Sequence, residues 1–431
     1  MFARPYLYIT AILLALGILY RQSTLVGIGV LAGLTLLIAW GWQRASLAGV
    51  TYERRFAEDH VFWGETVDLD VAITNFKLLP LSWLEAEEPF PRQIDFIEGA
   101  PELLPMPRQA LLAHTTALRW FERVRWQYTV RCPARGLYSF GPVTLRSGDL
   151  FGLYSRTVEQ PAPARLYVYP KLLELTALGL PPRHPFGDIR AQQPLLEDPL
   201  RTAGVREYRP EDPFKRVHWK ATARTGQLQV RQYEQTTEHT LMLFLNIESY
   251  AHIYEGIDSA RAEWAIVVAA SLARYATARR WSVGLRSNAP AADEGDSVRI
   301  APGRSPGQLT RMLEGLARML IYPVQGFTEV LRADAQSLPA GATVVVITPL
   351  LPDPLRGALL RLRERGLRLV VCALTDTRPE PVPGVLLYHL PPPRDAAFLR
   401  APEWSDPRGS AAPAPPDVVI APTAPPAVAR A

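Results

Sequence analysis

Two long apolar runs lie near the amino terminus, and they constrain this 431-residue chain more than any other feature. The first run covers residues 6–20 and the second covers 24–42, with three mostly polar residues between them. At about 1.5 Å of rise per residue, a helix over the second run is roughly 28 Å long, close to the thickness of a bilayer's hydrocarbon layer. The pattern predicts two transmembrane helices within residues 1–45, with the lipid bilayer as a partner.

Basic residues on both flanks of the two runs predict their orientation. Arg4 precedes the pair, Arg21 lies in the turn, and three arginines follow, namely Arg44, Arg54 and Arg55. Because basic residues favour the cytoplasmic side, both termini are expected in the cytoplasm. A signal peptide is the alternative, but it leaves the second run unexplained. We expect a multi-pass protein of the cell (inner) membrane with cytoplasmic soluble domains.

Residues 50–170 change to short alternating runs broken by Pro and Gly, the pattern of an antiparallel sandwich or small barrel. Residues 119–131 (RWFERVRWQYTVR) alternate apolar with charged or polar side chains, as a strand with one buried face does. We expect an immunoglobulin-like β-sandwich. Within it, Asp149 is expected to cap a turn, and Phe151 and Tyr154 are expected to fill the core.

Charged and aromatic residues are densest between 204 and 238, at the end of a linker segment that covers 171–238. Asp212 and Pro213 predict the start of a short helix over 214–223, and Thr225 and Gly226 predict its end. The candidate functional residues of this block are Arg206, Glu207, Tyr208, Asp212, Lys215, Arg216, His218, Trp219, Lys220 and Arg224.

Three interpretations of this block remain open. It could be a domain junction in which Arg and Glu pair and Trp219 anchors the packing. It could be a docking surface, since Arg, Tyr and Trp often dominate binding energy. It could also be an enzyme site, because His218, Lys220, Glu207 and Asp212 supply acid, base and electrophile. No nucleophile in a recognisable setting and no clustered metal-ligand spacing accompanies them, so we assign no catalytic residue and no cofactor.

The same block resembles the bacterial family called domain of unknown function 58 (DUF58). The resemblance rests on Arg-Glu-Tyr at 206–208, a basic pair at 215–216, and His-Trp-Lys-Ala-x-Ala-Arg at 218–224. The resemblance extends to the two amino-terminal apolar runs and to Asp-x-Phe-Gly-Leu at 149–153. This chain departs from the family's pattern at His218, where the family usually has Asp. The resemblance implies a MoxR-type AAA+ ATPase as partner, and sometimes a transglutaminase-like membrane protein.

Residues 239–390 alternate apolar strand patterns with helical patterns. The run at 241–247 fits a buried parallel strand, and 259–280 fits a long amphipathic helix. We expect an open, largely parallel sheet with helices on both faces. The order and lengths of the elements resemble the von Willebrand factor type A domain.

In that domain a D-x-S-x-S loop, with a Thr and an Asp from other loops, holds Mg²⁺. This chain has Asn246, Glu248 and Ser249 in the corresponding loop, and Thr348 followed by Pro349 after a later strand. Because carboxylates are lost, the resemblance implies a degenerate metal site, and we expect no bound metal. A metal-dependent binding module is the least favoured function.

The remaining composition narrows the functional classes. Residues 391–431 are rich in Pro and Ala and predict a disordered tail, with 418–420 as a short apolar exception. The 47 basic and 42 acidic residues are spread along the chain, so no nucleic-acid partner is expected. We therefore expect a membrane-anchored cytoplasmic scaffold or adaptor, with an enzyme built on the 204–238 block as the alternative.

Overall fold

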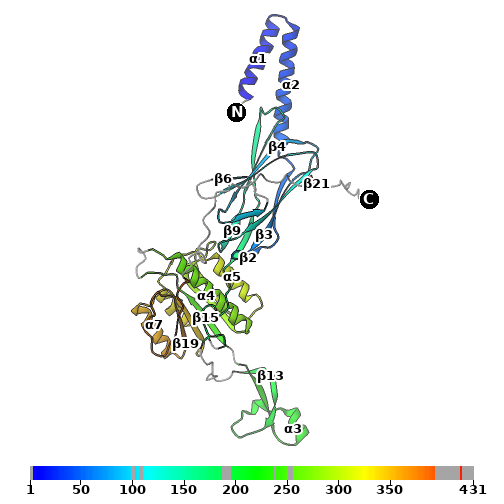
Figure 1. Cartoon of the computed structure of the whole chain (residues 1–431). Helices are drawn as coiled ribbons and strands as arrows, with labels where there is room; N and C mark the ends of the chain where they lie inside the picture. The colour runs from blue at the N-terminus through cyan, green and yellow to red at the C-terminus, as the bar shows by residue number, and fades with distance from the viewer. Residues whose placement is uncertain are drawn as a thin grey trace. The chain divides into compact units, whose positions relative to one another are not determined.

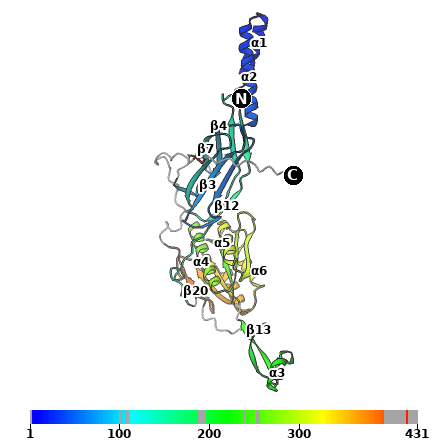
Figure 2. The same ribbon diagram turned by 90° about the vertical axis from the view of Figure 1, so that its right-hand side faces the viewer.

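The computed structural model describes residues 3–98, 102–105, 110–183, 185–186, 196–236, 239–250, 256–393 and 418–419 (Figures 1 and 2). The chain divides into two compact units. Met1–Tyr169 and Arg400–Ala431 form the first unit, and Pro170–Leu399 forms the second.

Two helices open the first unit, α1 (Ala3–Leu19) and α2 (Ser23–Ser46), and they form an antiparallel pair (Figure 1). Glycines allow their close approach, since a Cβ on Gly17 would lie 2.8 Å from the backbone nitrogen of Val26. By length and composition, α2 is the one helix in the described part of the chain that could cross a membrane, and α1 is shorter. The second span stays a prediction.

The β domain follows α2, and its strands are β1 (Val50–Phe56), β2 (His60–Phe62), β3 (Thr66–Asn75), β4 (Leu81–Phe90), β5 (Asp95–Glu98), β6 (Glu102–Pro105), β7 (Ala110–Leu118), β8 (Arg123–Arg131), β9 (Gly136–Phe140), β10 (Val143–Gly148), β11 (Ser155–Gln160) and β12 (Ala164–Tyr169). One sheet has the order β1-β3-β8 with β5 also on β8, another has β11-β10-β4-β7-β6, and a third has β2-β12-β9. Their inward side chains share one apolar core, which alternation along the strands predicted.

The β domain also buries a charged pair that the sequence did not reveal. Arg54 and Glu88 form an ion pair, and each side chain is only 1% exposed. The Tyr52 hydroxyl donates to Glu88 Oε2 at 2.6 Å, and the Arg54 guanidinium carbon lies 4.8 Å from the Phe140 ring centroid. Burial lowers the pKa of Arg54 to about 10. Arg54 is therefore a buried residue of the β domain and not one of the exposed charges that flank the apolar pair.

The turn between β10 and β11 is built on Asp149, which is 1% exposed. Its carboxylate accepts hydrogen bonds from the backbone nitrogens of Phe151 at 2.8 Å and Tyr154 at 2.6 Å, so the predicted turn cap is confirmed. The expectation that Phe151 fills the core is wrong, because this side chain is 57% exposed. The carboxylate holds the backbone of the turn inward, and the Phe151 side chain is left at the surface.

The second unit contains a six-stranded sheet of β15 (Thr240–Leu245), β16 (Ser282–Pro290), β17 (Ser297–Gly303), β18 (Thr343–Thr348), β19 (Arg368–Ala373) and β20 (Leu386–His389). The order is β17-β16-β15-β18-β19-β20, with β17 antiparallel and every other pair parallel, as the alternating pattern predicted. The helices are α4 (Ser259–Ala278), α5 (Gln308–Arg318), α6 (Phe327–Ala335) and α7 (Asp353–Glu364). Helices α6 and α7 cover the sheet face that carries Met242 and Phe244, while α4 contacts α5 and the central strands.

A hairpin module, defined here as residues 196–236, lies within the predicted linker segment of residues 171–238 and precedes the parallel sheet in sequence. Strand β13 (Leu196–Glu207) pairs antiparallel with β14 (Gln229–Thr236). A 3-10 turn, η1 (Phe214–Arg216), and a helix, α3 (Trp219–Thr225), connect the two strands (Figure 1).

Within the tail, the structure describes one short strand, β21 (Val418–Val419). It pairs antiparallel with β8, with Val418 opposite Val124. This pairing lies within the predicted apolar exception, and the rest of the predicted disordered tail from residue 394 lies outside the described residues.

Candidate functional site

The carboxyl edge of the parallel sheet is the first candidate site. In an open sheet of this strand order, the crevice for ligands lies where successive crossovers diverge, here between β15 and β18. Asn246 directly follows β15 and Thr348 ends β18, so both lie at this point. The structure brings them together, because Asn246 Nδ2 donates to Thr348 Oγ1 at 3.1 Å.

Asn288, on β16, completes a buried polar cluster at this edge and was not identified from the sequence. Its Nδ2 donates to Asn246 Oδ1 at 3.1 Å and to Glu248 Oε1 at 3.2 Å. Its Oδ1 accepts from the Ile247 backbone nitrogen at 3.0 Å. Asn246 and Asn288 are 1% and 0% exposed, respectively. We call Asn246, Glu248, Ser249, Asn288 and Thr348 the carboxyl-edge cluster.

Glu248 is the carboxylate of this cluster, and its surroundings have opposing effects on its pKa. Burial raises its pKa above the ordinary value, and nearby Glu329 adds to the effect. Hydrogen bonds from the Phe327 backbone nitrogen, at 2.9 Å, and from Asn288 favour the ionised form and oppose the rise in pKa. Oε1 is thus engaged by protein donors that a cation would have to displace.

The hydrogen bonds of the cluster connect the loops that follow strands β15 and β18. Ser249 Oγ donates to the Ile247 carbonyl at 3.4 Å, and Thr348 Oγ1 donates to the Leu350 carbonyl at 2.6 Å. Within the described ranges, no group of three or more His, Cys, Asp or Glu side chains is arranged to hold a metal ion. The absence of a bound metal stays a prediction.

Replacing Glu248 with alanine is expected to lower the free energy of unfolding by about 1–3 kcal/mol, because two buried donors lose their acceptor. Glu248→Gln keeps an acceptor oxygen and is expected to be near neutral at pH 7. The pKa of Glu248 is higher in the folded chain than in the unfolded chain, so the native chain loses stability as pH rises above the unfolded pKa. The glutamine variant has no such carboxyl group, so it should lose less stability than the native chain between acidic and neutral pH. Denaturant titrations of the native chain and both variants at the two pH values measure this. Equal stability of the two variants at pH 7 would contradict the acceptor role, and an equal change with pH in the native chain and the glutamine variant would contradict the pKa effect.

The hairpin module is the second candidate site, and an ion pair organises its loop. The Arg206 guanidinium donates to both oxygens of Asp212, at 2.7 and 2.6 Å, and the Arg209 backbone nitrogen donates at 2.9 Å. The Arg206 hydrogen bonds, followed by that of Arg209, hold the pKa of Asp212 below its usual range. The expectation that Asp212 caps a helix is therefore wrong, because both its oxygens are taken by donors upstream of the helix.

His218 takes the capping position instead. Its Nδ1 accepts from the Ala221 backbone nitrogen at 3.1 Å, and α3 begins one residue later. The helix ends at Gly226, whose φ of +71° places it in the left-handed region that glycine favours, as predicted. The start of the predicted helix is wrong, since residues 214–216 form a 3-10 turn. Aspartate is also a good N-cap residue, so it could serve the same role at this position.

Two aromatic side chains of the hairpin module face solvent. Phe214 and Trp219 are each 64% exposed, and the Tyr208 ring centroid lies 5.7 Å from that of Phe214. Packing within the described residues therefore leaves most of Trp219 uncovered. Exposed aromatic residues beside basic ones are typical of interaction surfaces. The basic residues of the same loop and helix are Lys215, Arg216, Lys220 and Arg224.

The residues of the enzyme interpretation make no hydrogen bond or ion pair with one another among the interactions of the described residues. Glu207 ends β13 and its carbonyl accepts from Arg206 at 3.1 Å, whereas Lys220 lies on α3. In the described part of the chain, neither a hydrogen bond nor an ion pair joins His218 to Glu207 or Lys220. Nδ1 of His218 is committed to the helix cap.

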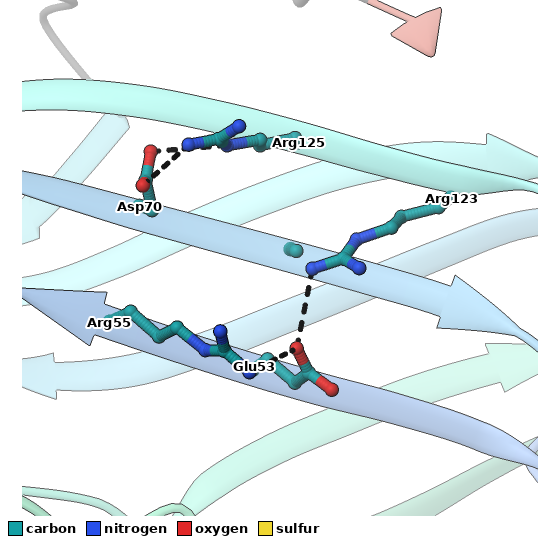
Figure 3. Close-up of a pocket in the computed structure, with 6 residues that line it drawn as sticks. Glu53, Arg55, Asp70, Arg123 and Arg125 are labelled. Atoms are coloured by element: carbon teal, nitrogen blue, oxygen red, sulfur yellow. Dashed lines mark hydrogen bonds and ion pairs between the residues drawn. The ribbon is translucent and has the colours of Figure 1, made fainter. Parts of the chain in front are cut away.

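A shallow hollow of about 160 Å³ lies on the outer face of β1, β3 and β8 (Figure 3). Cross-strand ion pairs line it. Arg125 Nη2 lies 2.6 Å from Asp70 Oδ2, and Arg123 Nη2 lies 3.3 Å from Glu53 Oε2, which also pairs with Arg55. Such pairs between opposite charges on neighbouring strands are ordinary surface contacts of a sheet. We do not assign a function to this hollow.

Comparison with known proteins finds a family model that matches part of the chain. Residues 204–402 match the family described as "Protein of unknown function DUF58", a region that holds most of the hairpin module and the parallel sheet. "Uncharacterized protein YeaD" of Bacillus subtilis (strain 168) is 24% identical over 245 residues, which are 56% of this chain. This chain spans 58% of that relative's length. The two matches support the DUF58 family, as the motif predicted.

Solved structures with some likeness cover between a quarter and about a third of the chain. They include the CARDB domain of the PF1109 protein from Pyrococcus furiosus, with 13% identity over 28% of this chain and 86% of that chain, and a TM-score of 0.19. A non-cellulosomal cohesin from Archaeoglobus fulgidus has 8% identity over 27% of this chain and 91% of that chain, also with a TM-score of 0.19. Likeness this low supports no inference about function.

Proposed function

We propose that this protein is a membrane-anchored cytoplasmic scaffold or adaptor, and that its hairpin module docks a partner protein. The observation that carries the proposal is the exposure of Phe214 and Trp219 on a small module whose loop and helix are fixed from within. The Arg206–Asp212 pair fixes the loop, and the His218 cap fixes the start of α3. A fixed surface loses less conformational freedom on binding, which favours affinity.

A MoxR-type AAA+ ATPase is the partner that we propose, and the support for it is the resemblance to the DUF58 family. A transglutaminase-like membrane protein is the second partner on the same grounds. The basic residues around the two aromatic side chains fit a partner surface that offers acidic groups around an apolar pocket.

We further propose that both apolar helices cross the membrane and that the soluble units lie in the cytoplasm. The support is the apolar length of α2 together with Arg4 and Arg44 on the flanks of the pair. We propose an immunoglobulin-like identity for the β domain and a von Willebrand A-like identity for the parallel-sheet unit. The strand order of the parallel sheet and the position of the carboxyl-edge cluster support the second identity.

Coprecipitation from native membranes tests the docking proposal. The tagged chain, extracted with a mild detergent, is expected to recover an AAA+ ATPase together with the full-length protein. Repeated recovery of the chain without such an ATPase would count against the proposed partner.

His218 variants separate docking from catalysis. Replacing His218 with alanine is expected to destabilise α3 by about 0.5–2 kcal/mol, whereas Asp and Asn keep a capping acceptor. Hydrogen exchange of the amides of residues 219–225 measures this locally, and partner recovery should follow the same order, with Asp and Asn close to native. The enzyme alternative predicts that Asn abolishes function while exchange stays native, and unchanged exchange in the alanine variant would contradict the capping role.

A further inference from the structure

Six large apolar side chains are exposed on three connections between strands of the β domain. They are Phe76 (60%), Leu78 (75%), Trp120 (62%), Phe121 (41%), Leu150 (56%) and Phe151 (57%), and we call them the end patch. The first two lie between β3 and β4, the next two between β7 and β8, and the last two between β10 and β11. So many exposed apolar side chains mark an interaction surface when they lie together.

Hydrogen bonds tie the first connection to the carboxyl end of α2 and to Gly49 just after it, and tie the second connection to the first. The Phe76 backbone nitrogen donates to the Gly49 carbonyl at 2.8 Å, and Lys77 Nζ donates to the Ala45 carbonyl at 2.9 Å. The Phe121 backbone nitrogen in turn donates to the Lys77 carbonyl at 3.3 Å. Both connections therefore lie beside the point where α2 leaves its apolar stretch.

Strand β11, which directly follows the third connection, is tied to the same end of the helix. Gln43 Nε2 donates to the Ser155 carbonyl at 2.9 Å, and Arg156 Nη1 donates to the Arg44 carbonyl at 2.6 Å. Ser155 begins β11 and directly follows the turn that exposes Leu150 and Phe151. The three connections that carry the end patch thus lie near the last turn of α2, at one end of the β domain.

The connections hold these side chains outward through internal bonds. Asn75 is fully buried, and its Nδ2 donates to the carbonyls of Leu79 at 3.0 Å and Arg119 at 2.8 Å, one in each of the first two connections. Phe121 has a φ of +54°, in the left-handed region. That conformation costs about 1–2 kcal/mol for a residue with a Cβ, and glycine would avoid the cost. An exposed phenylalanine at such a position suggests that its ring takes part in an interaction.

The depth of these connections follows from the length of α2. Its apolar stretch, residues 24–42, spans about 28 Å, which matches the hydrocarbon core of a bilayer. Residues 43–46 extend the helix by about 6 Å, which is the thickness of the headgroup layer on one side. The first connection and the start of β11, which bond to residues 43–49, consequently lie at headgroup level if α2 spans the bilayer, and the second and third connections lie next to them.

We propose that the end patch is a membrane-contact surface, in which these aromatic and aliphatic side chains enter the headgroup layer of the bilayer that α2 crosses. The inference rests on the proposed membrane anchoring. Aromatic rings favour this layer, and exposed Arg44, Arg119 and Arg156 beside them suit anionic phospholipids. The β domain then contacts the membrane at four places, namely α2 and three strand connections, and is not attached through α2 alone.

Site-specific fluorescence of the full chain in nanodiscs of phosphatidylcholine and phosphatidylglycerol tests the proposal. Single cysteines replace Leu78 or Trp120 and carry a polarity-sensitive fluorophore, and nitroxide lipids labelled at the headgroup act as the quencher. The native cysteines, Cys132 and Cys372, are buried, and burial raises the pKa of each thiol to about 12, so labelling at pH 7 selects the introduced residue.

The matched control is Ile97→Cys, an exposed position on β5 (54%) in the same domain. Strand β5 pairs with the far end of β8, about 20 Å along the strand from the β7–β8 turn. Labels at Leu78 and Trp120 are expected to shift to shorter wavelength and to be quenched at least about twofold more than the label at Ile97. Equal quenching at all three positions would overturn the inference.

A label at Leu34, exposed on α2, reports the anchoring itself through a nitroxide placed deep in the acyl chains. Quenching there without quenching at Leu78 and Trp120 overturns the membrane-contact surface and leaves the anchoring in place. The absence of quenching at Leu34 overturns both.

Discussion

If the hairpin module docks the proposed AAA+ ATPase, replacing Phe214 and Trp219 together with alanine is expected to weaken binding of that ATPase by about 30-fold or more. Truncating one central aromatic residue of an interface commonly costs at least about 2 kcal/mol, which corresponds to a factor of about 30 in affinity. The fold should be unaffected, because both side chains are 64% exposed in the isolated chain. Quantitative coprecipitation, or binding of the purified ATPase to the chain in nanodiscs, measures the change.

Tyr322→Ala is the matched control for this double variant. Tyr322 is also an exposed aromatic residue of the second unit, at 47%, but it lies outside the hairpin module. It should retain native binding. Native binding by the Phe214 and Trp219 double variant would remove the main support for the docking proposal, and an equal loss in the Tyr322 variant would point to a non-specific effect of exposed rings.

Replacing Glu88 with alanine is expected to lower the free energy of unfolding of the β domain by about 3–5 kcal/mol. The change leaves the Arg54 guanidinium buried without its carboxylate, and an uncompensated buried charge is among the most destabilising lesions known. The Tyr52 hydroxyl also loses its acceptor. Denaturant titration of the full chain in detergent, followed by tryptophan fluorescence, measures the loss.

Glu85→Ala on the same strand is the control for Glu88→Ala. Glu85 pairs with Arg146 at the surface, where the side chains are 37% and 55% exposed. Exposed pairs of this kind contribute about 0–1 kcal/mol, so the control should be close to native. Similar losses in the two variants would mean that the buried pair contributes little. A third variant, Arg54→Met with Glu88→Met, should recover much of the stability by replacing the charges with apolar volume.

Much of the fold follows from simple periodicity. The continuous apolar run at 241–247 became the central parallel strand, and the alternation over 119–131 became β8 with one buried face. These patterns are local, and burial acts on them directly. The capping role of Asp149 was also predictable, because an Asp followed by glycine and aromatic residues favours one tight turn.

The details of both candidate sites depended on partners that are distant in sequence. Asn288 lies 42 residues from Asn246, and only the strand order brings the two amides to one edge. In the sequence, Arg54 and Glu88 are indistinguishable from ordinary surface charges. Only the packing of the two sheets buries them. Asp212 is a good capping residue by type, but a bidentate arginine six residues earlier competes for its oxygens. Local propensity alone does not show whether Asp212 caps the helix or pairs with Arg206.

The most direct test of the docking proposal is photocrosslinking from position 219 in intact cells. A photoreactive phenylalanine analogue replaces Trp219 in the full chain, and a second strain carries the analogue at Tyr322. The docking proposal predicts a crosslinked product at 219 that contains the AAA+ ATPase, and no such product at 322. A well-expressed, membrane-associated chain that yields no crosslink to an ATPase from position 219 would contradict it.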